Sequence, residues 1–150
     1  MKIRLAISDE KYEEVKSYFQ TKGIDIDDEA EFILTEKEKY AGHISARKND
    51  TGDKAFIATD EVLYIESYGH QLEIVTSEEL FISKDPLYQL EKILDPKLFT
   101  RISKSVIISK RKVKEIRPSL SMKFVLVMAD NRKLEVTRNY YSSFKKAFNI

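Results

Sequence analysis

Residues 99–117 read FTRISKSVIISKRKVKEIR and set seven basic residues against one acid. The basic residues are Arg101, Lys104, Lys110, Arg111, Lys112, Lys114 and Arg117, and the acid is Glu115. Aliphatic residues interleave with these charges, so this basic segment can pack on a core while its cations face solvent. A cationic surface on a folded domain indicates a polyanionic partner, and nucleic acid is the first to consider. Taken alone, the segment is equally consistent with a solvated face that has no partner.

Outward from the basic segment, short runs of strand-forming residues predict a mostly β domain. Before it, five strands are predicted, at residues 43–47, 55–58, 62–67, 71–76 and 80–83. A helix is expected next, with Asp85 as N-cap and Pro86 at the first helical position. One face of that helix is predicted to carry Leu87, Leu90, Ile93 and Leu94. After the segment, residues 123–128 and 133–136 predict a hairpin, and Thr137 is expected to cap a last helix over residues 138–148.

The first 42 residues predict a separate, small α/β extension. Strands are expected at residues 2–7 and 30–35, on either side of a helix that begins at Ser8 or Asp9 and ends near Lys22. One stripe of this helix carries four apolar side chains, Tyr12, Val15, Tyr18 and Phe19. The acidic residues 24–29 are turn-like, and residues 36–42 are predicted to form a polar connector. Because such a β-α-β unit is too small to be stable alone, we expect it to pack on the rest of the chain or on a partner subunit.

Charge is distributed unevenly along the 150 residues, although the net charge is only +1. Residues 1–62 hold 10 Lys and Arg against 15 Asp and Glu, which gives −5, whereas residues 63–150 hold 16 against 10, which gives +6. An acidic first part and a basic second part indicate different roles. The absence of Cys excludes disulfides and thiol nucleophiles, and no apolar run is long enough for a signal peptide or a membrane span. We therefore expect a cytoplasmic protein.

Motifs for catalysis are missing from the sequence. The two histidines, His43 and His70, do not have the spacing of a metal site, and the four glycines form neither a P-loop nor a dinucleotide-binding motif. No G-x-S-x-G sequence is present. The sequence thus predicts a protein that is not an enzyme and that uses no metal, cofactor or small-molecule substrate.

From about residue 43 to the end, an ordered set of motifs resembles the LytTR family of bacterial DNA-binding domains. The motifs are VLYIES (62–67) followed by YGH (68–70), PLYQLEKIL (86–94), LFTRISKSVIISKRKVKEI (98–116) and EVTRNYYSSFKKAF (135–148). The resemblance implies that residues 43–150 form an elongated β-sandwich of stacked sheets with two short helices. It also implies that loops, rather than a recognition helix, enter successive major grooves of DNA.

The resemblance implies DNA contacts at three places in this chain. They are His70 after the YIES-like strand, Lys104 with Arg101 nearby in the segment after the F-x-R motif, and Arg138 at the start of the last helix. A helix N-terminus favours phosphate, and Arg can also pair with guanine, which agrees with a role for Arg138. A lone His in a turn is otherwise most often a solvated residue. Ser109 stands where an Asn is common in the family, a position that we interpret as structural.

Together these features predict a sequence-specific DNA-binding transcriptional regulator that acts on repeats in promoter DNA. The alternative is a non-catalytic protein-interaction module whose basic face binds an acidic partner. Residues 1–42 are too few for a phosphate-accepting receiver domain, so we expect them to mediate a homodimer or an inhibitory contact. For the second case the resemblance implies a cognate membrane protein as the inhibitor.

Overall fold

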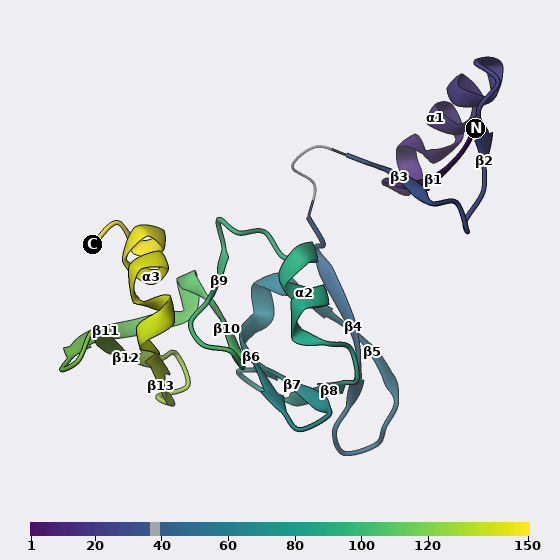
Figure 1. The fold of residues 1–150 in the computed structure, drawn as a ribbon. Helices are drawn as coiled ribbons and strands as arrows, with labels where there is room; N and C mark the ends of the chain where they lie inside the picture. Colours follow the sequence, from purple (N-terminus) through teal and green to yellow (C-terminus); the bar gives the residue numbers. More distant parts are fainter. Residues whose placement is uncertain (37–39) are drawn as a thin grey trace. The chain divides into compact units, whose positions relative to one another are not determined.

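The computed structural model describes residues 1–36 and 40–150 (Figure 1). The chain divides into two compact units, Met1–Lys39 and Tyr40–Ile150. Residues 37–39, part of the expected connector, lie outside the described residues. Among the described residues, no helix combines the length and the apolar character that a membrane crossing requires.

The first unit is a three-stranded parallel sheet with one helix. Its elements are β1 (Lys2–Ala6), α1 (Asp9–Thr21), β2 (Asp25–Ile26) and β3 (Phe32–Thr35). The sheet order is β2-β1-β3, and β1 pairs with β3 in parallel, as the predicted β-α-β unit requires. The expected turn within residues 24–29 is found at its end, where the Ala30 N–H donates to the Asp27 carbonyl at 3.0 Å. At Asp25 and Ile26 the expectation is wrong, because these residues pair with Lys2 and Ile3 and form a short strand.

Helix α1 begins after Ser8, one of the two starts expected from the sequence. The Ser8 hydroxyl makes no capping bond; the Ser8 N–H instead donates to Glu36 Oε1 at 2.6 Å. Tyr12 and Phe19 are half-buried, but Tyr18 is 59% exposed, so its place in the apolar stripe is wrong. At 100° per residue, Tyr18 lies a quarter-turn away from Phe19 and off the face that meets the sheet.

The second unit is built on a seven-stranded antiparallel sheet with the order β5-β4-β8-β7-β6-β10-β9. Its strands are β4 (His43–Lys48), β5 (Lys54–Ala58), β6 (Val62–Tyr68), β7 (Gln71–Thr76), β8 (Leu80–Ser83), β9 (Phe99–Arg101) and β10 (Val106–Ser109). All five strands predicted before the basic segment are present. A 3₁₀ turn, η1 (Thr59–Glu61), leads into β6.

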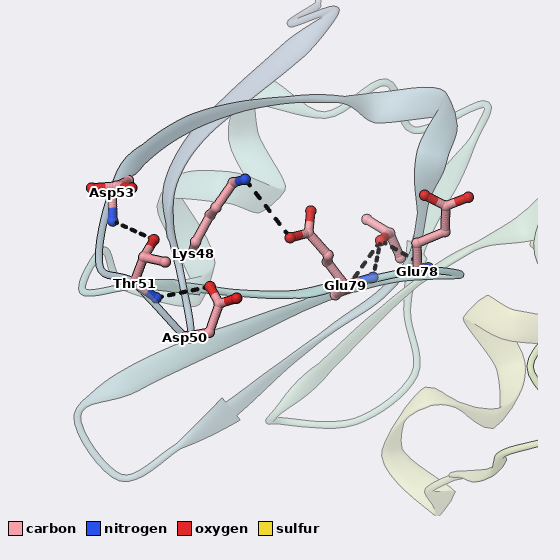
Figure 2. A network of polar contacts seen from close by, with 7 residues as sticks. Lys48, Asp50, Thr51, Asp53, Glu78 and Glu79 are labelled. Atoms are coloured by element: carbon pink, nitrogen blue, oxygen red, sulfur yellow. Dashed lines mark hydrogen bonds and ion pairs between the residues drawn. The ribbon is translucent and has the colours of Figure 1, made fainter.

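The predicted loop between β4 and β5 is closed by its own polar groups, as Figure 2 shows. The Asp50 carboxylate accepts from the Thr51 N–H at 2.8 Å, and the Thr51 hydroxyl accepts from the Asp53 N–H at 3.2 Å. Lys48 Nζ lies 3.9 Å from Glu79 Oε1 in the neighbouring β7–β8 turn. Both partners of this ion pair are exposed, so it contributes about 1 kcal/mol or less.

A second, three-stranded antiparallel sheet follows, formed by β11 (Val113–Ser119), β12 (Lys123–Met128) and β13 (Lys133–Val136). The predicted hairpin of β12 and β13 is confirmed, with Val127 opposite Lys133 at the turn. The chain then enters a 3₁₀ turn, η3 (Arg138–Tyr140), and a helix, α3 (Tyr141–Phe148). Another 3₁₀ turn, η2 (Lys110–Lys112), connects the two sheets.

The seven-stranded sheet has a separate hydrophobic cluster on each face. Along β10, Ile107 joins one cluster, whereas Val106 and Ile108 join the other, as the alternation of a strand requires. In β6 a bulge turns both Leu63 and Tyr64 toward the second cluster. Since that cluster includes residues of β12, β13 and α3, the two sheets stack, which confirms the predicted sandwich.

Helix α2 (Leu87–Ile93) covers the first cluster, the one that contains Ile107. It contributes Leu87 and Leu90, and Leu94, directly after the helix, also belongs to this cluster. It begins one residue later than expected, since Pro86 occupies the N-cap position. Ile93 is 42% exposed, contrary to the prediction, because it lies about 120° around the helix from Leu87.

Candidate nucleic-acid interface

Backbone hydrogen bonds join the three places expected to contact DNA. The Ser67 N–H at the end of β6 donates to the Ser105 carbonyl at 2.7 Å. The Thr137 N–H, just before η3, donates to the Ile102 carbonyl at 3.0 Å. The loop of residues 102–105 is therefore bonded both to β6, next to the β6–β7 turn, and to the residue that precedes η3. We refer to residues 69–70, 102–105 and 137–139 together as the loop cluster.

His70 lies in the two-residue turn between β6 and β7, where Tyr68 pairs with Gln71. Gly69 has φ +56° and His70 does not have positive φ, which is the pattern of a type II′ hairpin turn. The His70 side chain is exposed and borders a hollow of about 330 Å³ that Lys84 also lines. His70 is thus accessible at the tip of a regular hairpin.

Lys104 is the exposed residue of a loop whose other side chains face inward. Ile102 and Ser103 are buried, and Ser105 is half-buried. The Ile102 N–H donates to the Val106 carbonyl at 3.0 Å, and the Ser103 hydroxyl accepts from the Ser105 N–H at 3.2 Å. These bonds hold the loop in one conformation beneath the Lys104 side chain. Ser109, for which we expected a structural role, is 2% exposed.

Arg101 differs from Lys104, because its guanidinium group bonds to its own chain. Nε donates to the Ser103 carbonyl at 2.9 Å, Nη2 to the Lys104 carbonyl, and Nη1 to Glu91 Oε2 at 2.6 Å. Only 21% of the Arg101 side chain is exposed. The sequence grouped Arg101 with Lys104 as a contact to DNA, whereas in the fold it lies behind the loop that carries Lys104.

Arg138 is exposed at the first residue of η3, and within residues 1–36 and 40–150 its side chain has no hydrogen-bond or ion-pair partner. The expected helix over 138–148 starts three residues late, because α3 begins at Tyr141. The capping bond predicted for Thr137 is also absent: its hydroxyl lies 3.5 Å from the Ile102 carbonyl instead. The helix-dipole argument for Arg138 is therefore wrong in detail, because a three-residue 3₁₀ turn has only a small dipole.

The basic segment does not form one continuous surface in the fold. Lys104 precedes β10 and η2 follows it, and a four-residue strand separates them by about 13 Å. Arg117 Nε bonds to Glu115 Oε1 at 2.8 Å, which lowers the pKa of that carboxyl. Lys114 Nζ donates to Asn131 Oδ1 at 2.8 Å. The expected cationic face is thus divided between two ends of a strand and is partly neutralised.

Arg132 is an organising residue that the sequence did not reveal. From the β12–β13 turn it donates to the Tyr64 hydroxyl at 2.9 Å, to Glu66 Oε1 at 2.9 Å and to the Tyr68 hydroxyl at 3.1 Å. The hydrogen bond to Tyr68 is the main reason that the pKa of the Arg132 guanidinium group is raised above its usual value. Burial raises the pKa of Tyr64, although the Arg132 bond opposes that rise. The available signal was the Y-x-E-x-Y alternation of β6, which lines one face with acceptors.

Replacing Arg132 by Met is expected to lower the free energy of unfolding by about 1–2 kcal/mol, because three charge-assisted bonds between the two sheets are lost from a partly exposed group. Urea denaturation followed by circular dichroism measures the change. Lys114→Met is the matched control, since Lys114 makes a single bond near the same turn. Equal urea midpoints for Arg132→Met and wild type would show that Arg132 does not hold the sheets together.

Comparison with known proteins identifies a family that matches the chain. The profile of the LytTr DNA-binding domain matches residues 53–149. The sensory transduction protein LytT of Bacillus subtilis (strain 168) is 24% identical over 120 residues, which cover 80% of this chain and 50% of that protein. The transcriptional regulatory protein LytR of Staphylococcus aureus (strain N315) is 27% identical over 77 residues, which cover 51% and 31%. The chain therefore spans about half, or less, of the length of these relatives.

A solved LytTr DNA-binding domain from Bacillus cereus has the same fold as the second unit. It superimposes with a TM-score of 0.68 at 22% sequence identity, and the match covers 73% of this chain and 99% of that domain. At this identity the likeness is evidence for the fold alone.

Proposed function

The chain belongs to the LytTr DNA-binding domain family, and from that premise we propose that it binds promoter DNA in a sequence-specific manner and regulates transcription. The observation that carries the proposal is the loop cluster, whose backbone segments are linked by hydrogen bonds and carry three exposed side chains, those of His70, Lys104 and Arg138. Two of them are cationic, which favours contacts to DNA phosphates.

Each of the three side chains suits a contact in the major groove. Arg138 and Lys104 can donate to O6 and N7 of guanine or to a phosphate, and His70 can donate or accept one hydrogen bond. Because the loop of residues 102–105 is already held by its own bonds, little conformational freedom is lost on binding. We propose that these loops enter successive major grooves and that the protein has no catalytic role.

Selection of bound duplexes from a random pool tests the proposed function. A sequence-specific regulator should prefer the selected site over random duplex by about 10³-fold or more. Equal binding to all duplexes would contradict the proposal and would favour the protein-interaction alternative, in which the cations meet an acidic protein. Such a regulator would work in the bacterial cytoplasm, where its promoters are accessible.

For residues 1–42 we propose a contact role, either a homodimer or an inhibitory contact with a membrane protein. The support comes from β3, an edge strand on which Phe32 is 62% and Ile33 is 49% exposed. An apolar edge strand of a parallel sheet is normally covered. Sedimentation of the intact chain tests the dimer, and a monomer at all concentrations would contradict it.

A further inference from the structure

We propose that Arg101 is a positioning residue, which fixes the backbone of residues 102–105 so that Lys104 is presented to DNA in one conformation, an assignment that rests on the proposed function. The three donor nitrogens of the guanidinium group are all engaged within the protein. Arg101 therefore acts through Lys104 rather than by contacting DNA.

The geometry uses the planar shape of the guanidinium group. Nε and Nη2 lie on one edge of the plane and donate to two successive carbonyls, those of Ser103 and Lys104. Nη1, on the other side, bonds to Glu91 in α2. A fork of parallel N–H donors can meet adjacent acceptors in this way, whereas the single ammonium group of Lys cannot.

The carbonyls of Ser103 and Lys104 lie where no strand pairing in the described chain provides donors for them. They belong to the bend between β9 and β10, where the ladder between the strands has ended. Ser103 is only 8% exposed, so its carbonyl has little access to water, and an unpaired buried carbonyl is costly. Without Arg101, the bend would gain other conformations in which Ser103 reaches water, and Lys104 would move with it.

Glu91 supports the same role by holding and neutralising the guanidinium group. Its Oε2 lies 2.6 Å from Nη1, and its side chain is 47% exposed. The ion pair of Glu91 with Arg101 neutralises the charge of Arg101, so that, among the described residues, Lys104 is the unpaired cation of this loop. It also attaches the loop to α2, a helix anchored in the first hydrophobic cluster by Leu87 and Leu90.

The decisive variant is Arg101→Lys, which keeps the charge but cannot make the three bonds. Affinity for the selected duplex should fall about tenfold in the wild-type background, and less than about twofold in the Lys104→Ala background. The matched control is Arg117→Lys, because among the described residues the Arg117 guanidinium bonds to the nearby Glu115 carboxylate alone. That control should bind like wild type.

A second measurement does not depend on DNA. In the free intact chain, amide hydrogen exchange at Ser67 and Ser105 should be faster in Arg101→Lys than in wild type, because both amides bond within or to the loop. Exchange in α3 should be unchanged. If Arg101→Lys fails to fold, Glu91→Gln serves instead, and it should change binding and exchange in the same direction by a smaller amount.

Three results would overturn the assignment. Wild-type affinity in Arg101→Lys would show that the three bonds do not matter for binding. An equal loss in the wild-type and Lys104→Ala backgrounds would show that Arg101 contacts DNA independently. Unchanged exchange at Ser67 and Ser105 would show that the loop does not depend on Arg101. If the wild-type chain binds no duplex, the proposed function fails, and the exchange result still decides whether Arg101 holds the loop.

Discussion

Arg138→Ala is expected to weaken binding to the selected duplex by about 1–3 kcal/mol, or roughly 5- to 150-fold, and to leave the fold intact. The side chain is exposed and bonds to nothing in the described chain, so its removal breaks no contact of the folded state. The following helix is anchored independently, because Phe144 is fully buried and lies 5.1 Å from Phe124, centroid to centroid. A loss of affinity would thus report a lost contact with DNA.

Titration of a labelled duplex, with the selected site and with a random sequence, measures this effect. If Arg138 reads a base, the loss should be larger on the selected site, and the preference for that site should shrink. Lys112→Ala is the comparison, because a cation that steers only phosphates should weaken both duplexes about equally. Wild-type affinity of Arg138→Ala for the selected site would remove Arg138 from the proposed interface.

Strands in the second unit could be predicted wherever a short apolar run ended at a turn signal. This held for β6 and β7 and for the hairpin of β12 and β13. The basic segment could not be divided in the same way, because all four residues of β10 are buried and show no alternation. The charges of this segment indicated a solvent-exposed surface. In the fold, however, β9 and β10 complete the seven-stranded sheet, and β11 belongs to the three-stranded sheet.

Helix boundaries were less predictable than the strands. Thr137 carries a hydroxyl that is suited to an N-cap, but its backbone N–H is bonded to Ile102 across the fold. That tertiary bond is compatible with a 3₁₀ turn at Arg138 before α3 begins at Tyr141. A local propensity was thus outweighed by a contact between residues 35 positions apart, which no window of sequence reveals.

The residues of the candidate site were named from family motifs, and their contacts with DNA stay a prediction. Family motifs located His70, Lys104 and Arg138, and all three are exposed in the fold. The F-x-R motif drew Arg101 into the predicted site, but no motif indicated which bonds Arg101 or Arg132 makes within the fold. Their roles depend on acceptors that folding brings to them, and for Arg132 those acceptors are 64 to 68 residues away.

Raising the salt concentration from 50 to 200 mM is expected to weaken binding to the selected duplex roughly a hundredfold. Cations that neutralise phosphates release condensed counterions, so the logarithm of the affinity falls with the logarithm of salt at about −0.9 per phosphate. Lys104, Arg138 and two further exposed cations, Arg111 of η2 and Lys114 of β11, would together neutralise about four phosphates, for a slope of about −3.6.

Variants show which cations produce that slope. Lys104→Ala should make the slope shallower by about one if Lys104 neutralises a phosphate. Arg101→Lys keeps its charge and should leave the slope unchanged while the affinity falls. A slope near zero in the wild-type chain would mean that phosphates are not engaged, and the cations of the loop cluster would then need another partner.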